Sequence, residues 1–318
     1  MRSLTGDRTV RGVLIGFTLL AIAGFFLPAW IVNNVMFGLA RGLAVLGLLV
    51  LLRTGLVSFG HALYFGLGAY SVALLEQLAG VTELVPRLAG AVVVAGGLGW
   101  ILGFVLRRYR GIFFAMLSLA FSMALYGILV KTESLGSTDG FSVSPTVLFG
   151  WSPETRHVFL AMVAAVCAFA AIVVQVYLAS ALGHLTTAVR DNEIRVEYLG
   201  YPVARSIHTT YVLSAMLAGA AGGIMAMALG QVDPDSMVNW TVSGELVFIT
   251  IMAGAGNVAA PFIGGVVFEF IRTYAFELAP HAWQLIVGAT LLAIIFFLPN
   301  GLWSLIEKPW KKLEKRRG

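Results

Sequence analysis

The chain has 318 residues, of which 59% are hydrophobic and only 12% are charged, and its mean hydropathy is +0.89. This composition excludes an ordinary soluble protein, in which about a quarter of the residues carry a charge. The sequence therefore predicts an all-α, polytopic helical membrane protein in which residues 1–318 form a single transmembrane domain.

Ten apolar segments approach the length of roughly 20 residues that a helix needs to cross the hydrocarbon core of a bilayer. The eighth and ninth are the shortest, so they form either two separate spans or one broken element. The predicted spans, in chain order, are 12–32, 35–52, 61–80, 88–106, 111–131, 157–179, 208–229, 243–258, 261–278 and 281–299. About ten transmembrane helices are therefore expected.

Most of the 21 Lys and Arg residues fall on one side of these predicted spans. Cytoplasmic loops of membrane proteins are enriched in such residues, so the pattern places the N-terminus and the basic tail, 300–318, in the cytoplasm. The formal net charge of +5 then reflects topology and contact with anionic membrane lipid. No nucleic-acid partner is predicted.

A glycine-rich segment, Gly55–Tyr70, leads into the third predicted span and holds four glycines. Glycine at this density permits tight or broken helices, and exposed backbone at membrane depth is tolerated only beside protein or a watery cavity. The segment is therefore expected to line a translocation pathway, to pack closely against neighbouring helices through its small residues, or to do both. Its candidate pathway residues are Ser58, His61 and Tyr64.

The polar segment Arg190–Gly200 lies between two long apolar spans. Helical periodicity places an apolar set of residues on one face and charged residues on the other. The largely apolar face holds Leu185, Ala188, Val189, Asn192, Val196 and Leu199, and the charged face holds Arg190, Glu193 and Glu197. Asp191 and Arg195 are spaced for an intrahelical ion pair, and Gly200 ends the helix. The segment 184–206 is predicted to be a cytoplasmic docking surface.

Several charged residues lie within the predicted spans, where charge is costly and usually faces the bundle interior or the interface. They are Arg41, Glu245, Glu269, Arg272 and Glu277. Glu245 is a candidate pathway residue, as is Asn257 at the end of the eighth predicted span. The alternative for Glu245 is an interfacial acid at a helix N-terminus. Glu269 and Arg272 are three residues apart, which allows them to pair on one helix face.

The sequence carries no signature of catalysis or of cofactor binding. It has no Gly-x-x-x-x-Gly-Lys-Ser/Thr phosphate loop, its single cysteine, Cys167, lies in an apolar span, and its five histidines form no metal-binding pattern. No catalytic residue, metal site or cofactor is predicted for this chain. Any ATP would be hydrolysed by a partner.

Six motifs, taken in order, resemble the LivM-type permeases of branched-chain amino acid ABC importers. They are Gly55–Tyr70, Arg110–Met116, Gly136–Gly140, Arg190–Val203, Gly254–Gly256 and Phe297–Leu302. The resemblance covers nearly the whole chain. The sequence departs from it at Met252–Asn257, where many relatives carry a Leu-Gly-Gly-Leu/Met-Gly run.

The resemblance implies a multi-pass permease subunit of the bacterial inner membrane. Its expected partners are a LivH-like permease, two cytoplasmic ATPases that hold ATP and Mg²⁺, and a periplasmic binding protein that delivers the substrate. The helix near 190–200 would be the coupling helix. Its ATPase-coupling residues would be Arg190, Asp191, Asn192, Glu193, Arg195, Glu197 and Gly200.

Three alternatives differ in substrate or in class. Similar importers carry urea, short amides or aromatic acids instead of branched-chain amino acids. An ion-coupled secondary transporter would use an intramembrane carboxylate such as Glu245 or Glu269, but it needs no charged docking helix. A membrane-embedded enzyme is disfavoured because the sequence shows no convincing nucleophile, base or metal cluster.

Overall fold

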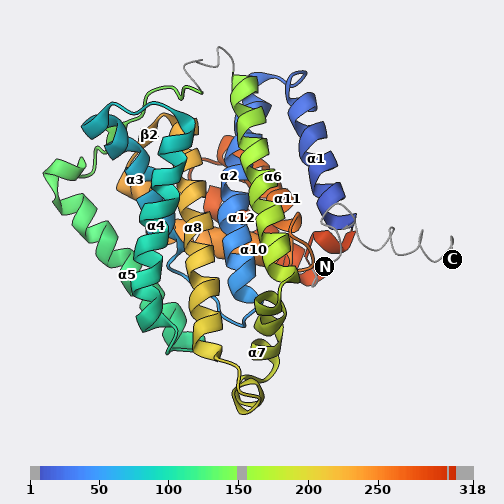
Figure 1. Ribbon diagram of the computed structural model, residues 1–318. Coiled ribbons are helices and arrows are strands. Elements are labelled where there is room, and N and C mark those ends of the chain that lie inside the picture. The colour runs from blue at the N-terminus through green and yellow to red at the C-terminus, as the bar shows by residue number, and fades with distance from the viewer. Residues whose placement is uncertain (1–7, 149–155, 299–300, 306–318) are drawn as a thin grey trace, which may run out of the picture.

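The computed structural model describes residues 8–148, 156–298 and 301–305. These residues are almost entirely helical, as the sequence predicts, and many of the long helices run side by side (Figure 1). The elements are α1 (Arg8–Gly24), α2 (Ala29–Leu52), α3 (His61–Ala79), α4 (Leu84–Leu106), α5 (Gly111–Lys131), η2 (Glu133–Leu135), β1 (Phe141–Ser142), α6 (Arg156–Ala179), α7 (Ala181–Tyr198), α8 (Val203–Leu229), β2 (Gln231–Val232), α9 (Pro234–Met237), α10 (Trp240–Ala253), α11 (Ala260–Leu278) and α12 (Trp283–Phe297).

Seven helical stretches among the described residues are long and apolar enough to cross a membrane: α2, α3, α4, α5, α6, α8 and the stretch Pro234–Ala253. The predicted number, about ten, is somewhat higher. α1 and α12 are apolar but have only 17 and 15 residues. α11 has 19 residues and carries Glu269, Arg272 and Glu277. The ten predicted segments all correspond to helices, so the excess lies in which helices span.

The boundary between the first two predicted spans was misplaced. The segment 12–32 was predicted as one span, but α1 ends at Gly24 and α2 begins at Ala29. Pro28 lies directly before α2 in an extended conformation, with φ −65° and ψ 152°. Proline lacks the N–H that a helix interior requires, so it separates the two helices.

α10 and α11 are separate helices, joined by residues 254–259. Gly254 adopts φ +82°, a backbone conformation that glycine reaches without steric cost, and α10 ends there. The chain then turns back, and a Cβ added to Gly264 would lie only 2.7 Å from the Cβ of Ala253. The eighth and ninth predicted segments are therefore two elements and not one broken span.

α2 and α8 form the centre of the bundle, where α8 packs against α2, α3 and α4 (Figure 1). The contact between α3 and α8 depends on glycine. A Cβ on Gly68 would overlap the backbone oxygen of Gly219, and a Cβ on Gly222 would overlap the backbone oxygen of Phe65. The glycine-rich segment therefore serves close helix packing, which is one of its two expected roles.

α5 lies at one edge of the molecule (Figure 1), and most of its surface is not covered by the rest of the chain. Ser118, near its middle, accepts a hydrogen bond from the backbone N–H of Phe59 at 3.2 Å. A Cβ on Gly60 would overlap the backbone oxygen of Ser118, so the two segments touch closely here. Nearer the end of α5, the Tyr126 hydroxyl donates to Asp235 Oδ1 at 2.7 Å.

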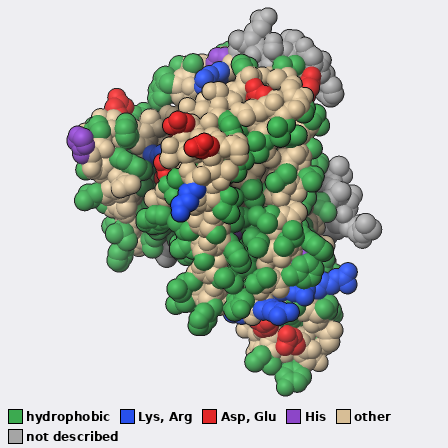
Figure 2. All heavy atoms as spheres, turned by 90° about the vertical axis from the view of Figure 1, so that its left-hand side faces the viewer, with side chains coloured by type: hydrophobic (Ala, Val, Ile, Leu, Met, Phe, Trp, Pro, Cys, Tyr) green, Lys and Arg blue, Asp and Glu red, His purple; other side chains and the backbone are tan. Residues whose placement is uncertain are grey.

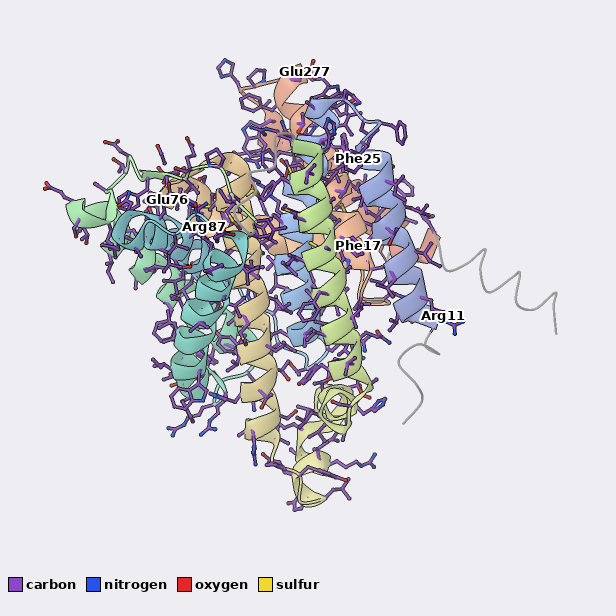
Figure 3. All side chains as sticks on the ribbon, turned by 45° about the horizontal axis from the view of Figure 1, so that its top comes forward. Arg11, Phe17, Phe25, Glu76, Arg87 and Glu277 are labelled. Atoms are coloured by element: carbon purple, nitrogen blue, oxygen red, sulfur yellow. The ribbon has the colours of Figure 1, made fainter. Side chains whose placement is uncertain are left out.

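The loop after α5 is attached to the bundle by a buried arginine. Arg87 donates to Glu76 Oε2 at 2.8 Å and to the backbone oxygen of Ser144 at 3.0 Å. The N–H of Ser144 in turn donates to both carboxylate oxygens of Glu76. Figure 3 shows Arg87 and Glu76 together at this end of the bundle. Residues 149–155 of the predicted outer loop lie outside the described residues.

The two ends of the bundle differ in charge. The end that carries α7 holds mainly arginines, namely Arg53, Arg107, Arg108, Arg110, Arg190, Arg195 and Arg205. The opposite end is mixed, with the acids Glu83, Glu133, Asp139, Asp233 and Asp235 beside Arg87, Lys131 and Arg156. Between them, hydrophobic side chains cover much of the surface seen in Figure 2. This distribution is typical of a membrane protein with a basic cytoplasmic side.

Candidate functional site

Four charged side chains meet inside the bundle: Arg41 of α2, Glu245 of α10, and Glu269 and Arg272 of α11. Arg41 Nη1 donates to Glu245 Oε2 at 2.9 Å and lies 3.3 Å from Glu269 Oε2. Arg272 Nη1 lies 3.9 Å from Glu269 Oε1. Two positive and two negative groups give a neutral cluster, which lowers the cost of holding charge away from water.

Glycine brings these helices together. Gly38 and Gly42 lie on either side of Arg41 on α2, and both face the backbone of α11. A Cβ on Gly265 would overlap the backbone oxygen of Gly38. Glu269 follows Gly265 by one helical turn, so this close crossing sets its carboxylate beside Arg41.

The four charged residues line a cavity of about 320 Å³. Its wall is partly apolar and aromatic, and the guanidinium of Arg272 lies 5.6 Å from the ring centre of Trp283. Polar groups complete the lining. The other lining residues are Phe37, Phe65, Met225, Leu229, Gln231, Asp235, Ser236, Thr241, Val242, Leu246 and Gln284. A mainly pre-formed cavity with a few convergent polar groups is the usual form of a small-molecule site.

Glu245, for which a pathway role and an interfacial role at a helix N-terminus were both considered, lies in this cavity. It pairs with Arg41, a residue 204 positions away in the sequence. The predicted pair of Glu269 and Arg272 is present, but at 3.9 Å it is the longest of the three contacts. Glu277 is exposed near the end of α11 and does not line the cavity.

Ser58, His61 and Tyr64 lie elsewhere, fully buried where α3 meets α8. His61 Nε2 lies 2.7 Å from Ser214 Oγ, and Ser214 donates to the backbone oxygen of Gly47 at 2.7 Å. The hydroxyls of Tyr64 and Tyr211 are 2.7 Å apart. None of the three predicted residues lines the charged cavity. His61 and Tyr64 thus join α3 to α8, whereas Ser58 accepts a hydrogen bond from the N–H of Gly60 just before α3.

Asn257 is also separate from the cavity. It lies between α10 and α11, and its Oδ1 accepts a hydrogen bond from the N–H of Ala259 at 3.0 Å. An asparagine side chain that accepts from the N–H two residues on closes a local turn. This bond gives Asn257 a local role in the turn before α11, beyond the opposite end of α10 from Glu245.

The segment around 190–200 is helical, but the prediction of one continuous helix was wrong. Asn192 has φ −162° and ψ 96°, which breaks α7 into two parts. Its Oδ1 accepts a hydrogen bond from the N–H of Arg195 at 2.9 Å and so begins the second part. Val189 and Val196 are buried as predicted, whereas Ala188, Asn192 and Leu199 are exposed.

Glu193 makes the strongest contact of this segment, and its partner was not anticipated. Arg110, directly before α5, donates to both carboxylate oxygens of Glu193, at 2.8 and 2.6 Å. Such a two-bond pair fixes the geometry of both groups. The break at Asn192 separates Asp191 from Arg195, and Asp191 instead lies 3.7 Å from Arg190.

Arg190 also contacts the end of α2. A Cβ on Gly55, which has φ +79°, would lie 3.0 Å from Arg190 Cγ, so this arginine covers the turn after α2. Burial and the positive charge of Arg190 lower the pKa of Arg53 in that turn. Arg53 also donates to the backbone oxygen of Ala255 at 3.5 Å. The turn thus connects α7 to the loop between α10 and α11.

Beyond these contacts, α7 ends in an exposed tip that carries apolar as well as charged side chains. Its apolar members are Ile194, Tyr198, Leu199 and Tyr201, between 55% and 88% exposed. Arg195, Glu197 and Gly200 are exposed beside them. The predicted coupling residues did not include Ile194, Tyr198 or Tyr201, although these three are spaced four and three residues apart, which is helical spacing. An exposed apolar patch with a polar rim is typical of a protein contact surface.

The fold and these two sites define a polytopic helical membrane protein of the transport permease class. The chain belongs to the family described as the permease component of branched-chain amino acid transport systems, which matches residues 30–295. This membership, with the apolar helices, makes the chain a polytopic protein of the inner membrane.

Several curated relatives are similar to the chain. The permease LivM of Salmonella typhimurium is 28% identical over 288 residues, which cover 82% of this chain and 66% of the relative, and LivM of Escherichia coli K12 is 27% identical with the same coverage. LivH of Salmonella typhimurium is 20% identical over 301 residues, covering 85% of this chain and 93% of the relative. The chain spans 66% of the length of these LivM proteins. No solved structure matches it.

Proposed function

We propose that this chain is the transmembrane permease subunit of an ABC importer for branched-chain amino acids. The observation that carries the proposal is α7, which projects from the bundle between α6 and α8 and ends in an exposed tip (Figure 1). The sequence has no phosphate loop of its own. Two partner ATPases would bind ATP and Mg²⁺, a LivH-like permease would complete the membrane part, and a periplasmic binding protein would deliver the substrate.

The α7 end of the bundle would face the cytoplasm, because it carries most of the described arginines. Arg11, near the start of α1, lies at the far end of α1 from Phe25, toward the α7 end (Figure 3). Near the other terminus, the N–H of Leu302 donates to the backbone oxygen of Met252 at the end of α10. Both termini would thus be cytoplasmic. The predicted basic tail, 300–318, lies largely outside the described residues.

α7 would couple ATP hydrolysis to transport by moving three helices at once. It continues directly from α6 and into α8, and Glu193 ties it to Arg110 at the start of α5. Val189 and Val196 anchor it on the bundle. A partner that binds the exposed tip differently in two nucleotide states would shift the position of all three helices.

The test is to substitute the most exposed aromatic residue of the tip, Tyr198→Ser, in the permease expressed with its partner subunits. Exposed tyrosines that anchor an interface often contribute about 2 kcal/mol, so co-purified ATPase should fall by about tenfold or more. Leucine uptake into cells should fall with it. Tyr109→Ser, an exposed tyrosine at the same end of the bundle, is the matched control and should change neither.

Uptake competition completes the test. Leucine, isoleucine and valine should compete with labelled leucine, whereas urea, short amides and phenylalanine should not. Unchanged ATPase recovery in the Tyr198→Ser variant would contradict the docking role of α7. Leucine transport by the purified permease alone, driven by an ion gradient in proteoliposomes, would make it a secondary transporter instead.

A further inference from the structure

The charged cavity between α2, α10 and α11 has hydrogen-bonding capacity that its own residues leave unused. Among the described residues, Glu269 Oε2 is buried without a hydrogen-bond partner, although it lies 3.3 Å from Arg41 Nη1. The Arg272 side chain is 36% exposed, and its contact with Glu269 is 3.9 Å long. Glu269 and Arg272 both line the cavity, so a carboxylate and a guanidinium with incomplete hydrogen bonding lie in the same wall.

Charge balance restricts what this cavity accepts. The four clustered groups sum to zero, and the fifth charged lining residue, Asp235, is exposed to solvent and bonded to Tyr126. A lone cation or anion bound among the four would leave an uncompensated charge within the bundle, which is costly. A ligand that carries one positive and one negative group keeps the cavity neutral. It also satisfies the unused donor and acceptor.

The rest of the cavity wall suits an apolar side chain. Phe37 of α2, Phe65 of α3 and Leu246 of α10 line it together with the charged residues. Polar residues from the end opposite α7, among them Gln231 and Asp235, line it as well. The cavity volume of about 320 Å³ lies at the small end of the usual range for ligand sites.

We infer that this cavity is a binding site for an α-amino acid in its zwitterionic form, entered during translocation. The ammonium group lies on the cavity side of Glu245 and Glu269, next to the Arg41 guanidinium that bridges them. The carboxylate lies at Arg272, and the apolar side chain packs on Phe37 and Phe65. Arg41 is a positioning residue, because its guanidinium is held by both glutamates. The inference rests on the proposed function and names the site through which it acts.

The first experiment uses three probes that share the leucine side chain and differ in their charged groups. Leucine carries both groups, leucinamide lacks the carboxylate, and 4-methylpentanoate lacks the ammonium. Each is titrated into the purified permease complex in lipid nanodiscs without the binding protein. Because a hydrogen bond to a charged group contributes about 1.5–3 kcal/mol, leucine should bind about tenfold or more tightly than either analogue. Equal affinity for all three would overturn the inference.

Two variants then change the charge of the cavity in opposite directions. Glu269→Gln leaves the cluster of Arg41, Glu245, residue 269 and Arg272 with a net positive charge. Leucine binding should therefore weaken about tenfold, and the affinity for 4-methylpentanoate should rise relative to that for leucinamide. Arg272→Gln makes the cluster negative and should produce the reverse preference. Only complexes that elute as the native assembly are measured. Glu277→Gln, an exposed acid on the same helix, is the matched control and should leave all three affinities unchanged.

A loss of leucine binding without the opposite shifts in analogue preference would assign the cluster a purely structural role and overturn the inference. The outcome is separable from that of the proposed function. Normal ATP-driven leucine uptake by a complex that binds no leucine in this cavity would leave the importer intact and remove the site. Absence of any ATP-driven amino acid uptake would instead remove the proposed function.

Discussion

Two polar clusters lie inside this bundle, and they differ in what surrounds them. At the junction of α3 and α8, His61 bonds to Ser214 and Tyr64 bonds to Tyr211 between closely packed helices, and His61 Nδ1 has no hydrogen-bond partner among the described residues. At the junction of α2, α10 and α11, charged groups surround a cavity, and Glu269 Oε2 has no hydrogen bond among the described residues. The first cluster joins packed helices, whereas the second lines a cavity. The presence of polar residues within membrane helices does not by itself show which of these two roles they have.

The largest expected effect is at the charged cluster. Arg41→Gln leaves Glu245 and Glu269 with only Arg272 to balance them, and removing one partner from a buried ionic cluster costs about 3–5 kcal/mol. The yield of monodisperse permease in detergent and its thermal unfolding midpoint should both fall. The double variant Arg41→Gln with Glu245→Gln restores a neutral cluster and should recover much of the loss. A single variant as stable as the native protein would show that the charges are solvated.

The next largest effect is expected at the junction of α3 and α8. Gly222→Ala places a methyl group on the backbone of Phe65, and forcing extra volume into a packed contact costs about 1–3 kcal/mol. Thermal unfolding of the purified protein measures the loss. Gly97→Ala is the control, since nothing lies within 4 Å of a Cβ there. Equal unfolding midpoints for the two variants would contradict glycine-dependent packing.

The smallest effect is expected from the tyrosine pair. Tyr64→Phe removes the hydrogen bond to Tyr211, and such bonds between membrane helices contribute about 1 kcal/mol or less. The unfolding midpoint should fall slightly, and the relative affinities for leucine, leucinamide and 4-methylpentanoate should stay the same. A changed preference among these probes would transfer ligand binding to the α3 junction and reverse the comparison.

The sequence predicted the helical class and nearly all helix positions, because apolar length is a local property. It misplaced the first boundary at Pro28 and missed the break at Asn192, where one side chain competes with the helix for backbone N–H groups. It identified each charged residue in the spans separately. It could not pair Arg41 with Glu245, since 204 residues separate them and only helix packing brings them together.

The exposed tip of α7 was missed for a different reason. The predicted coupling residues were mainly charged and did not include Ile194 or Tyr198. Burial depends on what the rest of the bundle covers, and α7 projects beyond the bundle (Figure 1). The structure places Ser58, His61 and Tyr64 in buried positions away from the charged cavity, a distinction that depends on helix packing and not on local sequence.

The attachment of α5 has a mechanical consequence. α5 is held by Arg110 at its start, touches the turn before α3 at Ser118, and is bonded through Tyr126 to Asp235, which lines the charged cavity. Eight residues, or about 12 Å of helix, separate each point from the next. α5 therefore connects Glu193 of α7 with Asp235 at the cavity through a single helix, so α7 and the cavity lining are mechanically joined although they lie toward opposite ends of the bundle.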